Sequence, residues 1–197
     1  MTAPIAAAFR RTSALLAAMA EDAALQDQIV QAATTCAGAL RAGGTILWCG
    51  NGGSAADAQH LAAELVGRLA RERPGLAAVA LTADTAALTA IGNDYGFERV
   101  FARQVEALGL PGDVLVALST SGRSANVIAA LETARAKGLA RIGLTGRGGG
   151  AMAALAEPCL RVPADDTQMI QEAHIVIGHV LCGLIENQMA GSTSAPG

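Results

Sequence analysis

The chain has 197 residues, of which 52% are hydrophobic, 3% aromatic and 16% charged, and its formal net charge is −3. That length can bury a sizeable core, whereas a slightly acidic chain without a basic patch is not expected to bind nucleic acid. So few charged residues indicate that other copies cover part of the surface, and we therefore expect a homo-oligomer.

No apolar run in the sequence reaches the roughly 20 residues that cross a bilayer. The amphipathic segment 5–19 lacks the order of charge, apolar core and cleavage site that marks a signal peptide. We therefore expect a cytoplasmic protein that does not enter the membrane. Its scattered cysteines are expected to be reduced and buried; they are Cys36, Cys49, Cys159 and Cys182.

Hydrophobic periodicity predicts two opening helices, at 5–19 and 24–41, and then short apolar strands that alternate with helices. Strands are expected at 45–49, 76–82, 113–118, 141–145 and 159–162. Helices are expected at 55–69, 84–92, 98–108, 124–137 and 151–156. A long last helix, capped by Asp166 or Thr167, is expected to run to about residue 189.

This alternation predicts an α/β fold: a three-layer sandwich whose five-stranded parallel sheet is covered by helices on both faces. We expect one domain, with N-terminal helices at about 1–42, an α/β core at about 43–163 and the C-terminal helix at about 166–190. In such sheets ligands bind beyond the carboxyl ends of the strands, where the strand order reverses. The polar loops at 50–54 and 119–122 both follow strands, so we expect both at that edge.

Four hydroxyl groups lie between the third strand and its helix, on Ser119, Thr120, Ser121 and Ser124. Gly122 lets backbone N–H groups turn inward, and the helix N-terminus adds donors and partial positive charge. An ordinary helix cap in a serine-rich turn is the alternative, but a cap needs only one hydroxyl. The cluster favours a phosphate site.

A second glycine loop, Asn51-Gly52-Gly53-Ser54, follows the first strand. It lacks the spacing and the acidic residue of a dinucleotide site and the lysine of a Walker loop, so we expect no nucleotide cofactor. Glycine turns after strands are common. We interpret this one as a place where the backbone approaches a small ligand closely.

His60 and Glu64 are four residues apart and share one face of the expected helix 55–69. Gln171 and His179 are about two turns apart on the last helix and lie roughly on one side of it. A His and a Glu at this spacing, joined by a distant His, suit a metal ion; a hydrogen-bonded pair of core histidines is the alternative. The same groups suit aldose–ketose isomerisation, which needs a carboxylate base and a group that protonates oxygens.

Motifs along nearly the whole chain resemble those of the bacterial phosphoheptose isomerases, a family of sugar isomerase (SIS) proteins. They are Cys49-Gly-Asn-Gly-Gly-Ser-Ala-Ala-Asp-Ala-Gln-His60 with Ala63-Glu-Leu65, Thr89-Ala-Ile-Gly-Asn-Asp-Tyr-Gly96, Leu118-Ser-Thr-Ser-Gly122 with Ser124-Ala-Asn126, and Ile170-Gln-Glu-Ala-His174 with His179. The resemblance implies a flavodoxin-like SIS fold with extra N-terminal helices. It also implies a homotetramer with active sites at subunit interfaces.

The resemblance further implies conversion of sedoheptulose 7-phosphate to D-glycero-D-manno-heptose 7-phosphate through an enediol, the first step toward the ADP-heptose of lipopolysaccharide. It implies Glu64 as the base and His179 as the acid/base partner. It implies one zinc ion per subunit, held by His60, Glu64, Gln171 and His179. Implied substrate contacts come from Asn51, Gly52, Gly53, Ser54, Asn93, Asp94, Ser119, Thr120, Ser121, Ser124 and Gln171.

Two assignments and two other functions stay open. Asn93 and Asp94 could contact sugar hydroxyls or only end a helix, and Asp165 or Asp166 could reach the sugar, although a helix cap is favoured. A non-catalytic SIS protein that binds a phosphosugar or associates with a replication initiator is one alternative, but such relatives lack the residues matching Glu64 and His179. An isomerase of another phosphosugar is the other, and those relatives usually carry an additional domain or a duplicated SIS unit.

Overall fold

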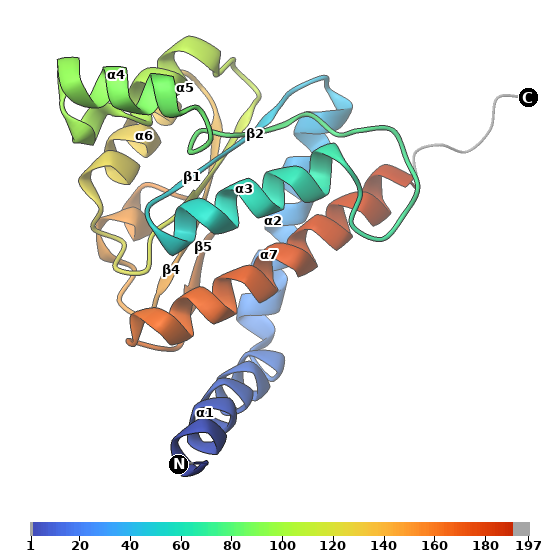
Figure 1. The fold of residues 1–197 in the computed structure, drawn as a ribbon. Coiled ribbons are helices and arrows are strands. Elements are labelled where there is room, and N and C mark those ends of the chain that lie inside the picture. Colours follow the sequence, from blue (N-terminus) through green and yellow to red (C-terminus); the bar gives the residue numbers. More distant parts are fainter. Residues whose placement is uncertain (1, 191–197) are drawn as a thin grey trace, which may run out of the picture.

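The structure is a computed structural model that describes residues 2–190 (Figure 1). Two helices, α1 (Ala3–Ala20) and α2 (Ala23–Arg41), precede a parallel sheet of β1 (Ile46–Gly50), β2 (Ala78–Ala80), β3 (Val114–Leu118), β4 (Ala140–Gly146) and β5 (Cys159–Val162). The remaining helices are α3 (Gly53–Val66), α4 (Thr85–Tyr95), α5 (Ala102–Leu108), α6 (Ala125–Ala136) and α7 (Thr167–Ala190). Short 3-10 turns lie at Phe97–Arg99 and Gly150–Ala154.

Helices cover both faces of the sheet, as the continuous apolar strands predict. Along β1, Ile46 and Trp48 pack into the core beneath α2, α3 and α7, whereas Leu47 and Cys49 face the core beneath α5 and α6. Figure 1 shows α3 and α7 side by side over one face and α1 reaching away from the sheet. The predicted three-layer α/β fold is confirmed.

The strand order is β2-β1-β3-β4-β5, so the chain reverses its direction across the sheet between β1 and β3. Gly50 at the end of β1 pairs with Leu118 at the end of β3. The loops after these two strands therefore leave the sheet side by side, at the point where ligands bind in folds of this kind.

Several predicted boundaries are wrong for identifiable reasons. The strand expected at 76–82 has only three residues, because the Leu76 amide bonds the Leu65 carbonyl of α3 at 3.0 Å instead of joining the sheet. The helix expected at 98–108 is interrupted: Gly96, at φ +87°, leads into a 3-10 turn, and α5 begins only at Ala102. The short helix expected at 151–156 is the second 3-10 turn.

By length and composition, α7 could cross a membrane, although one such helix is weak support for a span. One side of α7 is buried against α2, α3 and β4, and it carries the buried polar residues His174 and Glu186. We therefore describe α7 as a core helix. The four cysteines are free and buried, and burial raises the pKa of the Cys49 thiol to about 12, which keeps it protonated.

Candidate functional site

The candidate site lies along the seam between α3 and α7, which run parallel to each other. Gly53 at the start of α3 faces Gln171 near the start of α7; a Cβ at Gly53 would lie 2.7 Å from the Gln171 Nε2 atom. About two turns further along α7, Gly178 leaves room for Leu61, whose side chain would overlap any larger residue there. This close approach brings polar residues of the two helices into contact.

His60, Glu64 and His179 meet on this seam. The His60 Nε2 atom lies 2.8 Å from the His179 Nε2 atom and 3.2 Å from the Glu64 Oε1 atom. At 2.8 Å one imidazole donates and the other accepts, so the two rings hold complementary tautomers. The His60 side chain is 50% exposed and that of Glu64 21%, so a ligand can reach both from solvent. The predicted pair His60 and Glu64 and the distant His179 are thus brought together.

These three side chains fit a zinc ion by chemistry and spacing. Their donor atoms all lie within 4.8 Å of one another, and imidazole nitrogen with carboxylate oxygen is a common zinc donor set. A tetrahedral ion with bonds of about 2.0–2.1 Å separates its donors by roughly 3.3 Å, close to the 3.2 Å between His60 and Glu64, whereas the 2.8 Å between the two imidazole nitrogens is shorter and belongs to their hydrogen bond. The Gln171 carboxamide lies against Gly53, at the end of the seam where both helices begin.

Asp57 is a polar residue at this site that the sequence analysis did not single out. It lies one turn before His60 on α3, and its Oδ2 atom is buried without a hydrogen-bond partner among residues 2–190. Burial raises the pKa of the Asp57 carboxyl, while nearby His60 and His179 oppose that rise. The i, i+3 spacing to His60 is the signal that would have found it.

The hydroxyl loop after β3 forms a compact cluster. The Ser119 and Ser124 hydroxyls lie 2.9 Å apart, and the Ser121 hydroxyl accepts the Arg123 amide at 3.2 Å. Ser124 is the N-cap residue of α6, but within the described chain its hydroxyl makes no capping hydrogen bond to that helix's amides. Gly122 adopts φ +63°, and a Cβ at this position would overlap the backbone of Gly149, which excludes any side chain.

Asn51 links the two loops. Its side chain exchanges two hydrogen bonds of 2.8 Å with the carboxamide of buried Asn126 at the start of α6. This pair fixes the loop after β1 against the helix that follows the hydroxyl loop. Gly52 caps α3 at φ +55°, and Gly53 and Ser54 are already the first residues of that helix, two residues earlier than predicted.

The other candidate residues lie apart from this cluster. Asn93 and Asp94 are exposed in the last turn of α4, which ends at Tyr95 rather than at Gly92, and the Asn93 amide donates to the Asp94 carboxylate at 2.7 Å. Asp166 caps α7 by accepting the Met169 amide at 3.1 Å, which is the helix-cap role favoured over a contact with the sugar.

Near the start of α7, Asp165 forms an exposed ion pair with Arg147 at 3.2 Å. Part of a nearby depression is lined by Thr120 and Ser121 of the hydroxyl loop together with this pair. Asp165 therefore lies beside the hydroxyl loop without touching the histidines through any interaction described for residues 2–190.

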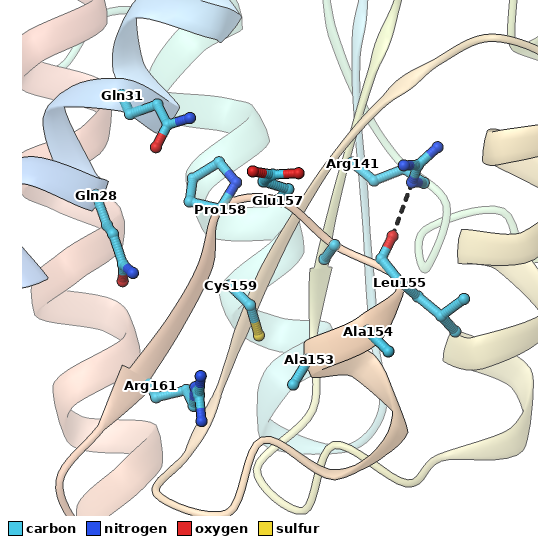
Figure 2. Close-up of a pocket in the computed structure, with 11 residues that line it drawn as sticks. Gln28, Gln31, Arg141, Ala153, Ala154, Leu155, Glu157, Pro158, Cys159 and Arg161 are labelled. Atoms are coloured by element: carbon cyan, nitrogen blue, oxygen red, sulfur yellow. Dashed lines mark hydrogen bonds between the residues drawn. The ribbon is translucent and has the colours of Figure 1, made fainter.

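A separate polar pocket of about 330 Å³ lies beside the outer edge of β5 (Figure 2). Gln28 and Gln31 of α2 line one side, and the Arg141 Nε atom donates to the Leu155 carbonyl at 2.7 Å on the other. Arg141 is near the amino end of β4, whereas both glycine-containing loops follow the carboxyl ends of strands. This pocket is therefore separate from the candidate site.

Residues 9–146, which include the parallel sheet up to β4 and both loops at its switch point, match the SIS (sugar isomerase) domain family. The phosphoheptose isomerase of Rhodospirillum rubrum is 60% identical over 161 residues, 82% of this chain and 86% of that protein. The structure of a phosphoheptose isomerase from Neisseria gonorrhoeae is similar with a TM-score of 0.87 and 49% identity, covering 93% of this chain and 97% of that one.

A second solved structure, a phosphoheptose isomerase from Francisella tularensis, matches with a TM-score of 0.89 and 41% identity over 93% of this chain and 97% of its own. The chain belongs to the phosphoheptose isomerase family, and it is an isomerase. The SIS match ends before α7, so Gln171 and His179 lie on a helix outside the matched segment.

Proposed function

We propose that this isomerase converts sedoheptulose 7-phosphate to D-glycero-D-manno-heptose 7-phosphate through an enediol. The observation that carries the proposal is the contact of His60 with both His179 and Glu64 on the α3–α7 seam, which brings a carboxylate and two imidazoles together. Family membership supports the substrate class, and the hydroxyl loop supports the phosphate. The noncatalytic alternatives are set aside because the chain belongs to an enzyme family.

Glu64 acts as the base in this scheme. Its carboxylate removes the proton from C1 of the ketose, next to the C2 carbonyl, and the electron pair forms the C1–C2 double bond of the enediol. Glu64, whose acquired proton can exchange with solvent, then delivers a proton to C2 as the O1 hydroxyl loses its proton and becomes the aldehyde. His179 moves the compensating proton between O1 and O2, a task that suits an imidazole with one donor and one acceptor nitrogen.

The substrate contacts follow from the two loops. We propose that Ser119, Thr120, Ser121 and Ser124 hold the phosphate, aided by the N-terminus of α6. The sugar lies where α3 and α7 begin, and the residues that border it there are Asn51, Gly52, Gly53, Ser54 and Gln171. Asn93 and Asp94 are proposed as contacts to a sugar bound at a neighbouring subunit, because they are exposed on α4 and away from this chain's histidines.

The phosphate assignment predicts a binding defect with little change in turnover. Ser124→Ala removes the hydroxyl that meets Ser119 at 2.9 Å, and phosphate contacts differ little between ground and transition state. We expect KM to rise about tenfold, which is about 1.4 kcal/mol of binding, with kcat within about twofold. Steady-state kinetics measure both. A large fall in kcat at unchanged KM would contradict the assignment.

We propose that His60, Glu64, Gln171 and His179 bind one zinc ion per subunit, which would supply Lewis acidity next to the substrate's carbonyl and hydroxyl oxygens. Removal of metal with a chelator, followed by gel filtration, is expected to abolish turnover, and added zinc is expected to restore it. Metal content by atomic absorption provides the control. Full activity of protein with less than a tenth of a zinc ion per chain would contradict the proposal.

The oligomeric state and the cellular location are further parts of the proposal. We propose that residues 1–197 act as one SIS domain, that four chains form a homotetramer with sites at subunit interfaces, and that the enzyme works in the cytoplasm. The half-exposed His60 and the exposed apolar residues Val66, Val176 and Val180 on α3 and α7 support a covered seam in the assembly. The product would feed ADP-heptose synthesis for lipopolysaccharide.

Proton NMR of sedoheptulose 7-phosphate with the zinc-supplemented protein in heavy water tests the function. We expect a new aldose anomeric signal and loss of protons at C1 of the ketose through exchange with solvent. Ribulose 5-phosphate and fructose 6-phosphate serve as matched substrates. Conversion of ribulose 5-phosphate or fructose 6-phosphate without conversion of the heptose would show that the substrate is another phosphosugar. No proton exchange with any of the three sugars would overturn the proposal.

A further inference from the structure

We propose that Arg73 and Glu186 are positioning residues for this isomerisation, forming a clamp that fixes α3 against α7 and thereby the spacing of Glu64 and His179. The two side chains form an ion pair of 2.9 Å between Arg73 Nη2 and Glu186 Oε1, and their exposed fractions are 8% and 1%. They lie 113 residues apart in the chain. This inference rests on the proposed roles of Glu64 and His179.

Glu186 binds the segment that follows α3. Its Oε1 atom accepts the Leu69 amide at 2.9 Å, and its Oε2 atom accepts the amides of Ala70 at 3.1 Å and Arg71 at 3.3 Å. The Arg73 Nε atom adds a fourth bond, to Oε1, at 3.1 Å. One buried carboxylate on α7 therefore holds the whole turn that leaves α3.

Arg73 binds the end of α3 itself. Its Nη2 atom donates to the Glu64 carbonyl at 2.9 Å, and its Nη1 atom donates to the Leu65 carbonyl at 2.8 Å and the Gly67 carbonyl at 3.2 Å. The last carbonyls of a helix lack partners within the helix. The guanidinium satisfies these carbonyls, and its ion pair with Glu186 connects the backbone of the proposed base to α7.

The clamp and the reactive cluster lie on one seam. Glu186 follows His179 by seven residues, which is about two turns and returns to the same face of α7. Gly178 and Leu61, the chain neighbours of His179 and His60, pack closely against each other, so the two helices are also held together at the cluster itself. Because α3 and α7 carry both sets of residues, a shift at the clamp changes the contacts of His60 with His179 and Glu64, where about 1 Å of misplacement can cost roughly 100-fold in rate.

Stability alone is a weak reason for this pair. Burying two charges carries a desolvation penalty, and apolar residues of similar volume often stabilise a protein equally well. The pair does what apolar residues cannot: Arg73 donates hydrogen bonds to four carbonyls and Glu186 accepts them from three amides, all at fixed positions. That directional role is the one expected of residues that set the geometry of a neighbouring site.

The test compares Glu186→Gln and Arg73→Lys with Val105→Ala, a cavity variant in the core on the opposite face of the sheet. We expect kcat of both clamp variants to fall roughly 10- to 100-fold with KM within about twofold, because the phosphate loop is untouched. Competition with a chromophoric chelator is expected to show about tenfold weaker zinc binding. Val105→Ala is expected to lower the unfolding midpoint in urea while keeping kcat and zinc affinity.

Unchanged kcat and zinc affinity in both clamp variants would overturn the proposal. An equal fall of kcat in Val105→Ala, or loss of the folded circular-dichroism spectrum in both clamp variants, would also overturn it, because the pair would then be structural only. An inactive wild type would instead contradict the proposed function, and the zinc competition would still test the clamp. An active wild type with active clamp variants contradicts the clamp alone.

Discussion

Replacement of Glu64 by glutamine is expected to abolish isomerisation and leave the chain folded. Glutamine keeps the size of the side chain but cannot accept the C1 proton, and a positioned base contributes roughly 10²- to 10⁴-fold to rate. Glu64 is partly exposed and its only described side-chain contact among residues 2–190 is with His60, so little packing is lost. We expect kcat to fall by at least about 100-fold, measured by the heptose NMR assay.

Exchange of the C1 proton with heavy water, measured on wild type and variant with equal zinc content, separates the role of Glu64 as base from its proposed role as zinc ligand. If Glu64 removes this proton, the Glu64→Gln variant loses exchange together with turnover. Glu72→Gln is the matched control: it is the same chemical change on an exposed carboxylate whose only described ion pair is a 3.6 Å contact with Arg68, and exposed pairs contribute little. Undiminished exchange in Glu64→Gln would assign the base to another residue, with Asp57 the first to examine.

The fold was largely predictable because local signals and tertiary structure agree in the sheet. The predicted bounds of the strand 159–162 are the observed ones, because Pro158 and Pro163 limit this mostly apolar run at both ends. The strand at 76–82 was overextended, because the length of an edge strand depends on which amides find partners. The Leu76 amide bonds α3, a contact that no local pattern contains.

The site was predictable where its residues are neighbours on one helix. His60 and Glu64 follow from their i, i+4 spacing, and the hydroxyl loop follows from its position after a buried strand. The contact of His60 with His179 depends on the parallel packing of α3 on α7, which in turn needs Gly178 opposite Leu61. Arg73 and Glu186 carry no local signal at all, because they meet only through the same packing.

Acid is expected to destabilise the folded chain through His174. The ring is fully buried on α7 beside the Thr145 backbone, and among the described residues neither of its nitrogens makes a hydrogen bond of acceptable geometry. Burial lowers the pKa of His174 from 6.5 to about 4, against a smaller opposing effect of the Thr145 backbone. The folded chain therefore holds this imidazole neutral in mildly acidic solution, where the unfolded chain protonates it.

The sign of the effect follows from this difference in pKa. Above pH 6.5 both states are neutral at His174 and stability is unaffected. Between pH 6.5 and about 4 only the unfolded state takes up the proton, so the free energy of unfolding falls as the pH falls. The full difference corresponds to roughly 3 kcal/mol at about 1.4 kcal/mol per pH unit. A fall of that size is a large part of the stability of a typical domain.

Urea unfolding of wild type, His174→Leu and His174→Gln at pH 7.5, 6.0 and 5.0, at one protein concentration, measures this effect. Neither variant can titrate at position 174, so we expect both to lose much less stability than wild type between pH 7.5 and 5.0. The leucine variant also removes two buried nitrogens without partners, and for that reason we expect it to equal or exceed wild type at pH 5.0. Parallel pH curves for all three proteins would show that His174 is solvated or hydrogen-bonded in solution, and the acid sensitivity would then belong to other groups.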